Sequence, residues 1–429
     1  MTRRAIGFAL GTLALLALVL AALVWAMNVR GEDGIEDAAA PTPSDAQLVA
    51  RGAYLARVGN CMTCHTERGG AAYAGGRSID TPFGAVYSSN LTPDAATGIG
   101  TWSASQFWRA LHNGRSRDGR LLYPAFPYPN YTMVTRGDSD AIYAFLHSQS
   151  AVRQPNKAHG VRWPFDTQVA LAVWRALYFK PGPYAPDAAQ SADWNRGAYL
   201  VDGLAHCSAC HSRRNALGAN SNMFDLSGGL IPMQNWYAPA LNSPTEAGVA
   251  GWQIEQVVRM LQTGIAPRGS VLGPMAEVVL SSTQFWSEAD LRAMAIFLKA
   301  LPQTGPAAPP ATGAIVPSVA LRGAKLYDEH CAQCHGEQGQ GVPGAYPSLA
   351  GNRAVLMRET ANLVQVVLNG GFAPATQGNP RPYGMPPYVL RLNDADVAAV
   401  LTHLRTSWGN RAPLVSELEV SRQRSSGAQ

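Results

Sequence analysis

The chain has 429 residues, of which 47% are hydrophobic and 15% are charged, and its net charge is +5. This length predicts about three domains, and the hydrophobic share excludes a wholly disordered chain. The small positive charge, without a basic cluster, excludes nucleic acid as a partner. The 42 glycines and 30 prolines predict long irregular loops between short helices.

The first predicted element is a membrane anchor over residues 1–30. Residues 5–27 are uncharged and mostly apolar, and a helix needs about 20 such residues to cross a bilayer. Arg3 and Arg4 precede this stretch, and Glu32 and Asp33 follow it. The positive-inside rule then keeps the N-terminus in the cytoplasm and exports the rest. A cleaved signal peptide is the alternative; its apolar region is usually only about 7–15 residues long, and it would deliver the chain to the same compartment.

The six cysteines form three C-x-x-C-H motifs, and none is spare. The pairs are Cys61 and Cys64, Cys207 and Cys210, and Cys331 and Cys334, followed by His65, His211 and His335. In such a motif two thiols bind one haem covalently, and the histidine is the proximal ligand of its iron. Zinc sites and thioredoxin-like redox sites also use CxxC pairs, but the latter need a βαβ pattern that the sequence lacks. Three repetitions that use every cysteine favour three haem c groups.

A common pattern surrounds the three motifs. Each motif follows an Arg-Gly-Ala-x-Leu string, which predicts a helix that leads to the haem; the strings begin at Arg51, Arg196 and Arg322. Each repeat ends in a capped amphipathic helix; these helices begin near Asp138, Ser287 and Asn393. Two such helices that cross beside a haem are the arrangement of class I cytochromes c. The sequence therefore predicts an all-α protein with three tandem class I cytochrome c domains behind one N-terminal transmembrane helix.

Proline-rich stretches set the predicted boundaries. The anchor is followed by a first domain over 44–150, a connector over 151–190 and a second domain over 191–302. A Pro/Ala-rich linker over 303–317, a third domain over 318–410 and a flexible tail over 411–429 complete the chain. Within the connector, residues 163–179 are apolar and aromatic and predict a helix outside the haem repeats. This helix is either a strut between domains or a docking surface for a partner or for the membrane interface.

A second axial ligand, usually methionine, keeps an electron-transfer iron six-coordinate. In each repeat a predicted helix ends at a glycine and a loop follows. The second and third loops contain Met275 and Met385, each beside a proline that stiffens the chain. We expect these two methionines to be the distal ligands of the second and third irons.

The first repeat departs from this pattern. Phe126 stands where a methionine is expected, and it cannot bind iron. Met133 is the nearest substitute and is the predicted distal ligand. His112 is a weaker candidate, and His147 is expected to be a surface or packing residue. A five-coordinate first haem, open to small ligands, is the remaining alternative.

The chain resembles the membrane-bound triheme cytochrome c subunits of bacterial periplasmic dehydrogenases that oxidise alcohols, gluconate, fructose or aldehydes. The resemblance covers about residues 45–410 and rests on several strings beyond the haem motifs: residues 90–94, 98–102, 122–125, 273–279 and 282–284. It implies that electrons pass from the cofactor of a catalytic subunit through the haems to ubiquinone or a terminal oxidase. It also implies the bacterial inner (cytoplasmic) membrane, with the haem domains on the periplasmic side.

The residues 126–128, Phe-Pro-Tyr, are similar to those of family members paired with a molybdenum hydroxylase-type subunit and its iron–sulfur subunit. A quinoprotein or flavoprotein partner is the alternative. The sequence offers no convincing nucleophile and base, so we expect an electron-transfer subunit without substrate chemistry of its own. A peroxidase-like haem enzyme that uses an open first haem, and a tethered carrier between unrelated complexes, are the other interpretations.

Overall fold

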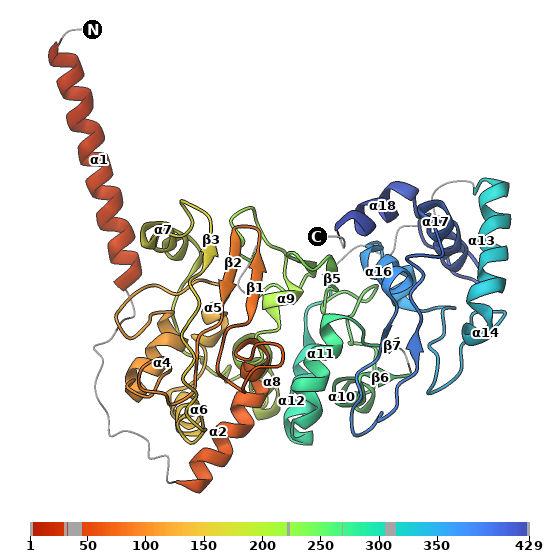
Figure 1. Ribbon diagram of the computed structural model, residues 1–429, viewed down its shortest axis with the longest axis horizontal. Coiled ribbons are helices and arrows are strands. Elements are labelled where there is room, and N and C mark those ends of the chain that lie inside the picture. The colour runs from red at the N-terminus through yellow and green to blue at the C-terminus, as the bar shows by residue number, and fades with distance from the viewer. Residues whose placement is uncertain are drawn as a thin grey trace. The chain divides into compact units, whose positions relative to one another are not determined.

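The structure is a computed structural model that describes residues 3–29, 32, 45–220, 224–267, 269–304 and 315–426. The protein is mainly helical, with one apolar helix near the N-terminus and a few short strands (Figure 1). It divides into two compact units. Unit 1 comprises Met1–Ala56, Cys61–Ala185 and Ala216–Ala219, and unit 2 comprises the remaining residues.

Unit 1 contains the apolar helix and the first CxxCH motif. Its elements are α1 (Arg3–Val29), α2 (Ala46–Val58, mostly in this unit), α3 (Cys61–Cys64), β1 (Ser78–Thr81), β2 (Gly84–Tyr87), α4 (Ala104–Asn113), α5 (Tyr128–Tyr131), α6 (Arg136–His147), β3 (Gly160–Val161) and α7 (Gln168–Tyr178). The three strands form an antiparallel sheet with β2 in the middle. The stretch Ile6–Val29 of α1 is long and apolar enough to cross a membrane, and no residue of its 18-residue apolar window is buried in the protein.

Unit 2 contains the other two motifs. The elements around the second motif are α8 (Ala192–Ala198), the π-helix η1 (Tyr199–Leu204), α9 (Ser208–His211), β4 (Gly229–Ile231), β5 (Trp236–Ala238), α10 (Ile254–Thr263), β6 (Ile265–Ala266), β7 (Gly269–Ser270), α11 (Pro274–Ser281), the 3₁₀-helix η2 (Thr283–Phe285) and α12 (Glu288–Ala300). Those around the third are α13 (Pro317–His330), α14 (Ala332–His335), α15 (Arg353–Leu356), α16 (Ala361–Asn369), β8 (Gly371–Phe372), β9 (Gly384–Met385), α17 (Asp394–Thr406) and α18 (Glu417–Ser426). The strands pair as β4–β5, β6–β7 and β8–β9, all antiparallel.

The same helix crossing occurs three times, between α2 and α6, α8 and α12, and α13 and α17. At each crossing a glycine of the first helix lies against a backbone carbonyl of the second; the pairs are Gly52 with Ala141, Gly197 with Ala293, and Gly323 with Ala399. A Cβ atom at any of these glycines would overlap the carbonyl oxygen. The glycine of the Arg-Gly-Ala-x-Leu string is therefore required by the close approach of two helices.

The arginine of the same string forms an ion pair across each crossing. The pairs are Arg51 with Asp138, Arg196 with Asp290 at 2.8 Å, and Arg322 with Asp396 at 2.7 Å. Each aspartate lies in the first turn of its helix, where a negative charge also meets the positive end of the helix dipole. The repeated ion pair therefore sets the register of the two helices.

The π-helix η1 is particular to the second repeat. The first cysteine of each motif follows the string's arginine by 10, 11 and 9 residues in the three repeats. The longest spacing is the one that contains η1. A π-helical turn holds one more residue than an α-helical turn, so η1 takes up the additional residue without changing the crossing.

The predicted helix ends are confirmed at three glycines. Gly114, Gly264 and Gly370 follow α4, α10 and α16 with φ angles of 59°, 79° and 64°. The closing helices α12 and α17 are capped by Ser287 and Asn393, as expected. In the first repeat α6 begins earlier than predicted, with Thr135 as its cap.

The prediction of a flexible tail over 411–429 is wrong for most of this segment. Helix α18 packs against α16 and α17, and the side chain of Val420 is fully buried. Val415 belongs to the same core, and Arg424 forms an ion pair of 2.6 Å with Asp394. The tail has few apolar residues, but Val415 and Val420 among them point to one core, which the overall composition does not reveal. Residues 305–314 of the predicted linker lie outside the described residues.

Within unit 2, the second and third repeats are joined by hydrogen bonds between polar side chains and backbone. The Asn362 side chain bonds both backbone groups of Tyr237, each at 2.7 Å. Thr376, in the loop between β8 and β9, donates to the carbonyl of Thr263 at the end of α10 at 3.2 Å. The loops that follow α10 and α16 therefore lie side by side.

Candidate haem-binding sites

The first motif is one turn of helix. Cys61 and Cys64 begin and end α3, so their thiols lie on the same side, and the backbone N–H of His65 donates to the carbonyl of Cys61 at 3.0 Å. The corresponding bonds from His211 to Cys207 and from His335 to Cys331 are 3.0 and 2.9 Å. None of the six cysteines forms a disulfide. Each motif therefore presents two thiols and an imidazole from one compact turn.

The three histidine rings are oriented in the same way. In each ring Nδ1 lies at hydrogen-bond distance from a backbone carbonyl: His65 from Ser89 at 2.7 Å, His211 from Pro239 at 2.7 Å, and His335 from Pro347 at 3.0 Å. A carbonyl only accepts, so Nδ1 carries the proton and Nε2 keeps a lone pair for a metal. The sequence does not reveal these carbonyls, because their distance along the chain differs in every repeat.

Burial keeps the imidazoles neutral. It lowers the pKa of His65, His211 and His335, against a smaller opposing effect of the carbonyl bonds. A neutral imidazole is the form that binds iron. The electrostatics of the three rings therefore agree with the proximal role predicted from the sequence.

The first cysteine of each motif has a pKa too high for thiolate chemistry near neutral pH. Burial raises the pKa of Cys61 and of Cys207 to about 12, and that of Cys331 to about 11. Redox-active and metal-binding cysteines have the opposite shift, because they react as thiolates. Among the described residues, no group of three or more His, Cys, Asp or Glu side chains could hold a metal ion. A pair of protonated thiols beside a neutral imidazole fits covalent haem attachment, in which the sulfurs become uncharged thioethers.

Met275 and Met385 are held by tightly constrained loops. Met275 follows Pro274 at the start of α11, after Gly273, whose φ is 56° and whose Cβ would overlap the ring of Trp236. Met385 lies in β9 and pairs with Gly371 of β8. Both side chains are half-buried. Their role as distal ligands stays a prediction, supported by the rigidity of their backbone.

The corresponding part of the first repeat is aromatic. The Phe126 ring lies 5.3 Å from the ring of Tyr131. Burial, and then the nearby thiols of Cys61 and Cys64, raise the pKa of Tyr131, which places its phenol close to the first motif. The Tyr131 phenol therefore lies near the first motif, with the Phe126 ring packed against it.

Met133 lies two residues beyond Tyr131 in the same helical turn, with its N–H donating to Asn130 at 3.0 Å. Side chains two residues apart point in nearly opposite directions. The Met133 carbonyl accepts from the backbone of Tyr184 in the connector at 3.3 Å. Met133 stays the sequence-based prediction for the first iron, and a five-coordinate iron beside Phe126 and Tyr131 stays the alternative.

The two alternative histidines of the first repeat are engaged in packing. His112 is buried in α4 and its ring is stacked on Trp108, with centroids 4.3 Å apart. His147 packs on Tyr143 with centroids 4.1 Å apart, as its interpretation as a packing residue predicts.

Several known proteins are similar in sequence to this chain over most of its length. Residues 320–408 match the cytochrome c family. The cytochrome c subunit of the quinone-type alcohol dehydrogenase of Gluconacetobacter polyoxogenes is 38% identical, over 91% of this chain and 87% of that one. The cytochrome c subunit of gluconate 2-dehydrogenase from Pantoea cypripedii is 36% identical, over 93% and 91%.

A nicotinate dehydrogenase subunit of Pseudomonas putida is 42% identical over 84% of this chain, which corresponds to 30% of that longer protein. The three CxxCH turns, their oriented histidines and the near full-length similarity lead to one conclusion. The chain belongs to the family of cytochrome c subunits of dehydrogenase complexes, in which its part is electron transfer.

Proposed function

We propose that the chain carries three haem c groups in three tandem class I cytochrome c domains, over residues 44–150, 191–302 and 318–410. In this proposal it passes electrons from the catalytic subunit of a dehydrogenase to ubiquinone or a terminal oxidase. The observation that carries the proposal is the threefold repetition of one histidine geometry, Nδ1 bonded to a backbone carbonyl beside a CxxC turn.

The proposed haem-holding residues fall into three sets. The covalent attachments are Cys61, Cys64, Cys207, Cys210, Cys331 and Cys334, the proximal ligands are His65, His211 and His335, and the distal ligands are Met275 and Met385. Each bound haem supplies an iron that gains or loses one electron. The methionine sulfur favours the ferrous state, and the carbonyl behind each histidine fixes the ring and increases its basicity.

Contacts within unit 2 support transfer between the second and third repeats. The loops expected to cover the distal sides of these two haems touch where Thr376 bonds Thr263 and where Pro374 packs against Gly264. Asn362 and Arg353 add further bonds between the two repeats; Arg353 donates to the carbonyl of Gly248 at 2.6 Å. Such contacts keep the separation of two redox groups constant.

For the catalytic partner we favour a molybdenum hydroxylase-type subunit with an iron–sulfur subunit. Support comes from the Phe-Pro-Tyr string at 126–128. The proposed location is the bacterial inner membrane, with α1 as a retained anchor and the haem repeats on the periplasmic side. The charges that flank α1 support this orientation.

The test is purification of the native complex from membranes in mild detergent, followed by addition of candidate substrates. Alcohols, aldehydes, gluconate and N-heteroaromatic acids are added in turn while the ferrous haem α-band is recorded. We expect reduction of all three haems by one substrate class in the complex, and none in the isolated chain. Substrate oxidation by the isolated chain would contradict an electron-transfer role.

A second function is favoured by the aromatic lining of the first site. If Phe126 and Tyr131 leave the first iron open, that haem binds small ligands, as in a peroxidase-like haem enzyme. Carbon monoxide titration of the reduced chain, followed by a peroxidase assay, separates the two functions. Ligand binding without peroxidase turnover would leave electron transfer as the function.

A further inference from the structure

Helix α7 exposes a continuous apolar stripe. Val169 and Leu177 are 73% and 62% exposed, and Val173 lies between them on the same face, also exposed. Residues spaced by four lie above one another on a helix, so the three side chains form one row. Trp163, just before the helix, is 80% exposed. The charged residue of α7, Arg175, is buried on the opposite side.

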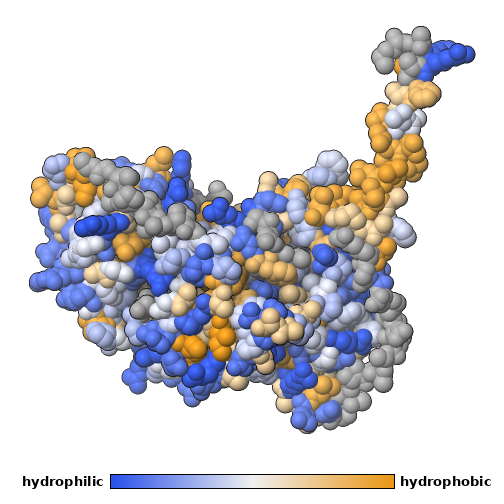
Figure 2. All heavy atoms as spheres, turned by 180° about the vertical axis from the view of Figure 1, so that it is seen from behind, coloured by the Kyte–Doolittle hydropathy of each residue, from blue (hydrophilic) through white to orange (hydrophobic). Residues whose placement is uncertain are grey.

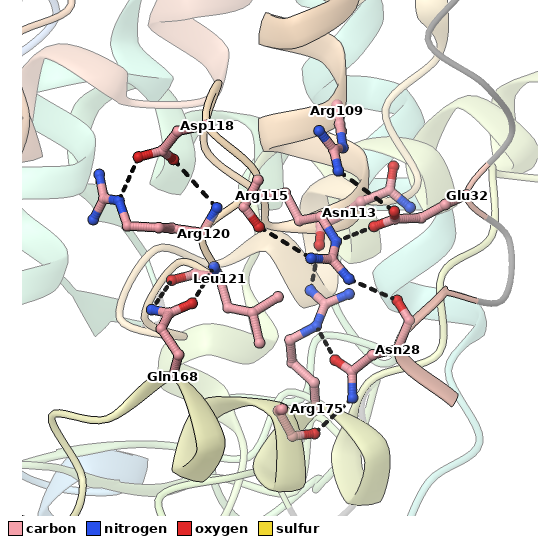
Figure 3. Close-up of polar contacts among 12 residues, drawn as sticks. Asn28, Glu32, Arg109, Asn113, Arg115, Asp118, Arg120, Leu121, Gln168 and Arg175 are labelled. Carbon is pink, nitrogen blue, oxygen red and sulfur yellow. Dashed lines mark hydrogen bonds and ion pairs between the residues drawn. The ribbon is translucent and has the colours of Figure 1, made fainter. Parts of the chain in front are cut away.

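The other face of α7 is fixed to the end of α1. The Asn28 side chain donates to the carbonyl of Ala172 at 2.8 Å, and the Arg175 guanidinium donates to the Asn28 side chain at 2.9 Å (Figure 3). Arg175 also donates to the carbonyl of Asn113 at the end of α4. Asn28 is therefore a joint between the anchor helix, α7 and the first haem repeat.

A second arginine completes this joint. Arg115 donates to the backbone carbonyl of Asn28 at 3.0 Å and forms an ion pair with Glu32, just beyond α1 (Figure 3). Arg109 lies 3.5 Å from the same carboxylate. These groups are largely buried, so they hold the end of α1 in one orientation relative to α7.

The apolar surface of α1 continues onto the body of the protein. In Figure 2 the hydrophobic colour runs from the base of the protruding helix onto the adjoining surface. Exposed cations lie before and after α7, at Arg162 and Lys180, and one exposed carboxylate, Asp166, lies directly before its cap. An apolar helix face with flanking cations and nearby aromatic residues is the composition of a helix that lies in a membrane interface.

We infer that α7 lies on the outer surface of the same bilayer that α1 crosses, with Val169, Val173 and Leu177 inserted among the lipid acyl chains and Arg162 and Lys180 at anionic headgroups. The occupant of this face is lipid rather than protein, because the face is continuous with the membrane anchor and is fixed to it by Asn28. The inference rests on the proposed role of α1 as an anchor. The first haem repeat is then held against the membrane at two places instead of hanging from one helix.

The test uses the full haem-loaded chain in vesicles of phosphatidylethanolamine and phosphatidylglycerol at about three to one. The native cysteines are consumed by haem attachment, so an introduced cysteine is the one that takes a nitroxide label. Val173→Cys reports on α7, Leu16→Cys on α1, and Ser150→Cys on an exposed loop after α6. Collision rates with oxygen and with a water-soluble nickel chelate then measure the depth of each label.

We expect the ratio of oxygen to nickel collisions at Val173 to exceed that at Ser150 by about threefold or more, and to approach that at Leu16. Leu177→Cys should reproduce the result. Insertion at Leu16 with a water-like ratio at Val173 would overturn the inference while leaving the anchor intact. A water-like ratio at Leu16 would overturn the anchor, and the inference with it. Unchanged haem absorption in each variant verifies that the fold is retained.

Discussion

The loops that follow α4 in the first repeat and α10 in the second begin alike and end differently. Each leaves its helix through a left-handed glycine, Gly114 or Gly264, and each then pairs with itself as a short antiparallel ladder. The first loop leads to Phe126, whose ring faces Tyr131, whereas the second leads to Met275 at the start of α11.

This difference distinguishes the scaffold that the repeats share from the loop end that varies between them. The helix crossing, the arginine–aspartate pair and the carbonyl behind the histidine occur in both repeats, so they belong to the scaffold. In the proposed haem sites, the group opposite each histidine is supplied by the end of one loop. The redox properties of a repeat can therefore change without a change in the fold that holds it.

The largest expected effect comes from making the second repeat resemble the first. Met275→Ala removes the proposed sulfur ligand, so one of three reduction potentials should fall by on the order of 0.1 V or more. Spectroelectrochemical titration measures this. The control Met233→Ala changes an exposed methionine and should leave all three potentials in place. Three unchanged potentials in Met275→Ala would show that this methionine is not a ligand.

The reverse exchange makes the first repeat resemble the second. In the wild-type chain we expect about one haem to bind carbon monoxide, because Phe126 in the place of methionine would leave the first iron without a distal ligand. Phe126→Met should abolish that binding, and Met133→Ala should not alter it. Absorption difference spectra provide the measurement. If the wild type binds no carbon monoxide and Met133→Ala does, then Met133 is the first distal ligand.

The shared scaffold is tested by Gly52→Ala. The new methyl group would overlap the carbonyl of Ala141 in α6, so the variant should lose roughly 2–3 kcal/mol of unfolding free energy. Gly137→Ala, in α6 itself, meets no atom within 4 Å and should be neutral or slightly stabilising. Denaturant unfolding followed by circular dichroism compares the two. Equal stability would mean that the helices do not cross as closely as described.

A smaller, pH-dependent effect on folding stability is expected from Asp202 in the π-helix of the second repeat. Burial raises the pKa of Asp202 to about 7, from an ordinary value of 3.8. The folded state holds this proton more tightly than the unfolded chain, so stability is greatest below about pH 4 and falls as the pH rises through about 7. Between about pH 5 and pH 8, wild type should lose on the order of 1–3 kcal/mol relative to Asp202→Asn.

Unfolding midpoints across this pH range provide the measurement for Asp202. Asp193→Asn, which changes an exposed carboxylate of α8, is the control and should follow the wild-type profile. Parallel profiles for wild type and Asp202→Asn would place Asp202 in contact with solvent.

The sequence predicted the features that recur at fixed spacing. The CxxCH motifs, the glycines that end α4, α10 and α16, and the caps Ser287 and Asn393 depend on neighbouring residues, so local pattern identifies them. The Arg-Gly-Ala-x-Leu strings were also visible, but the sequence did not show which contacts require them. It lies in partners that are between 74 and 94 residues away, as the ion pairs of Arg322 and Arg196 show.

Features that depend on tertiary packing escaped prediction. Helix α18 is stabilised by Val415, Val420 and Arg424, three residues in a stretch that is otherwise polar. The carbonyls of Ser89, Pro239 and Pro347 carry no side-chain signal, since any residue can supply a backbone oxygen. The direction of Met133 depends on the short helix α5, which a proline-rich string does not predict.

The central claim is that three haem groups are covalently bound along one chain. The most direct measurement is the pyridine haemochromogen assay on purified protein of known concentration, with the variant Cys207→Ala/Cys210→Ala measured beside it. The account predicts about three haems per wild-type chain and about two per variant chain. A wild-type value near two or below, or a variant value equal to that of wild type, would contradict it.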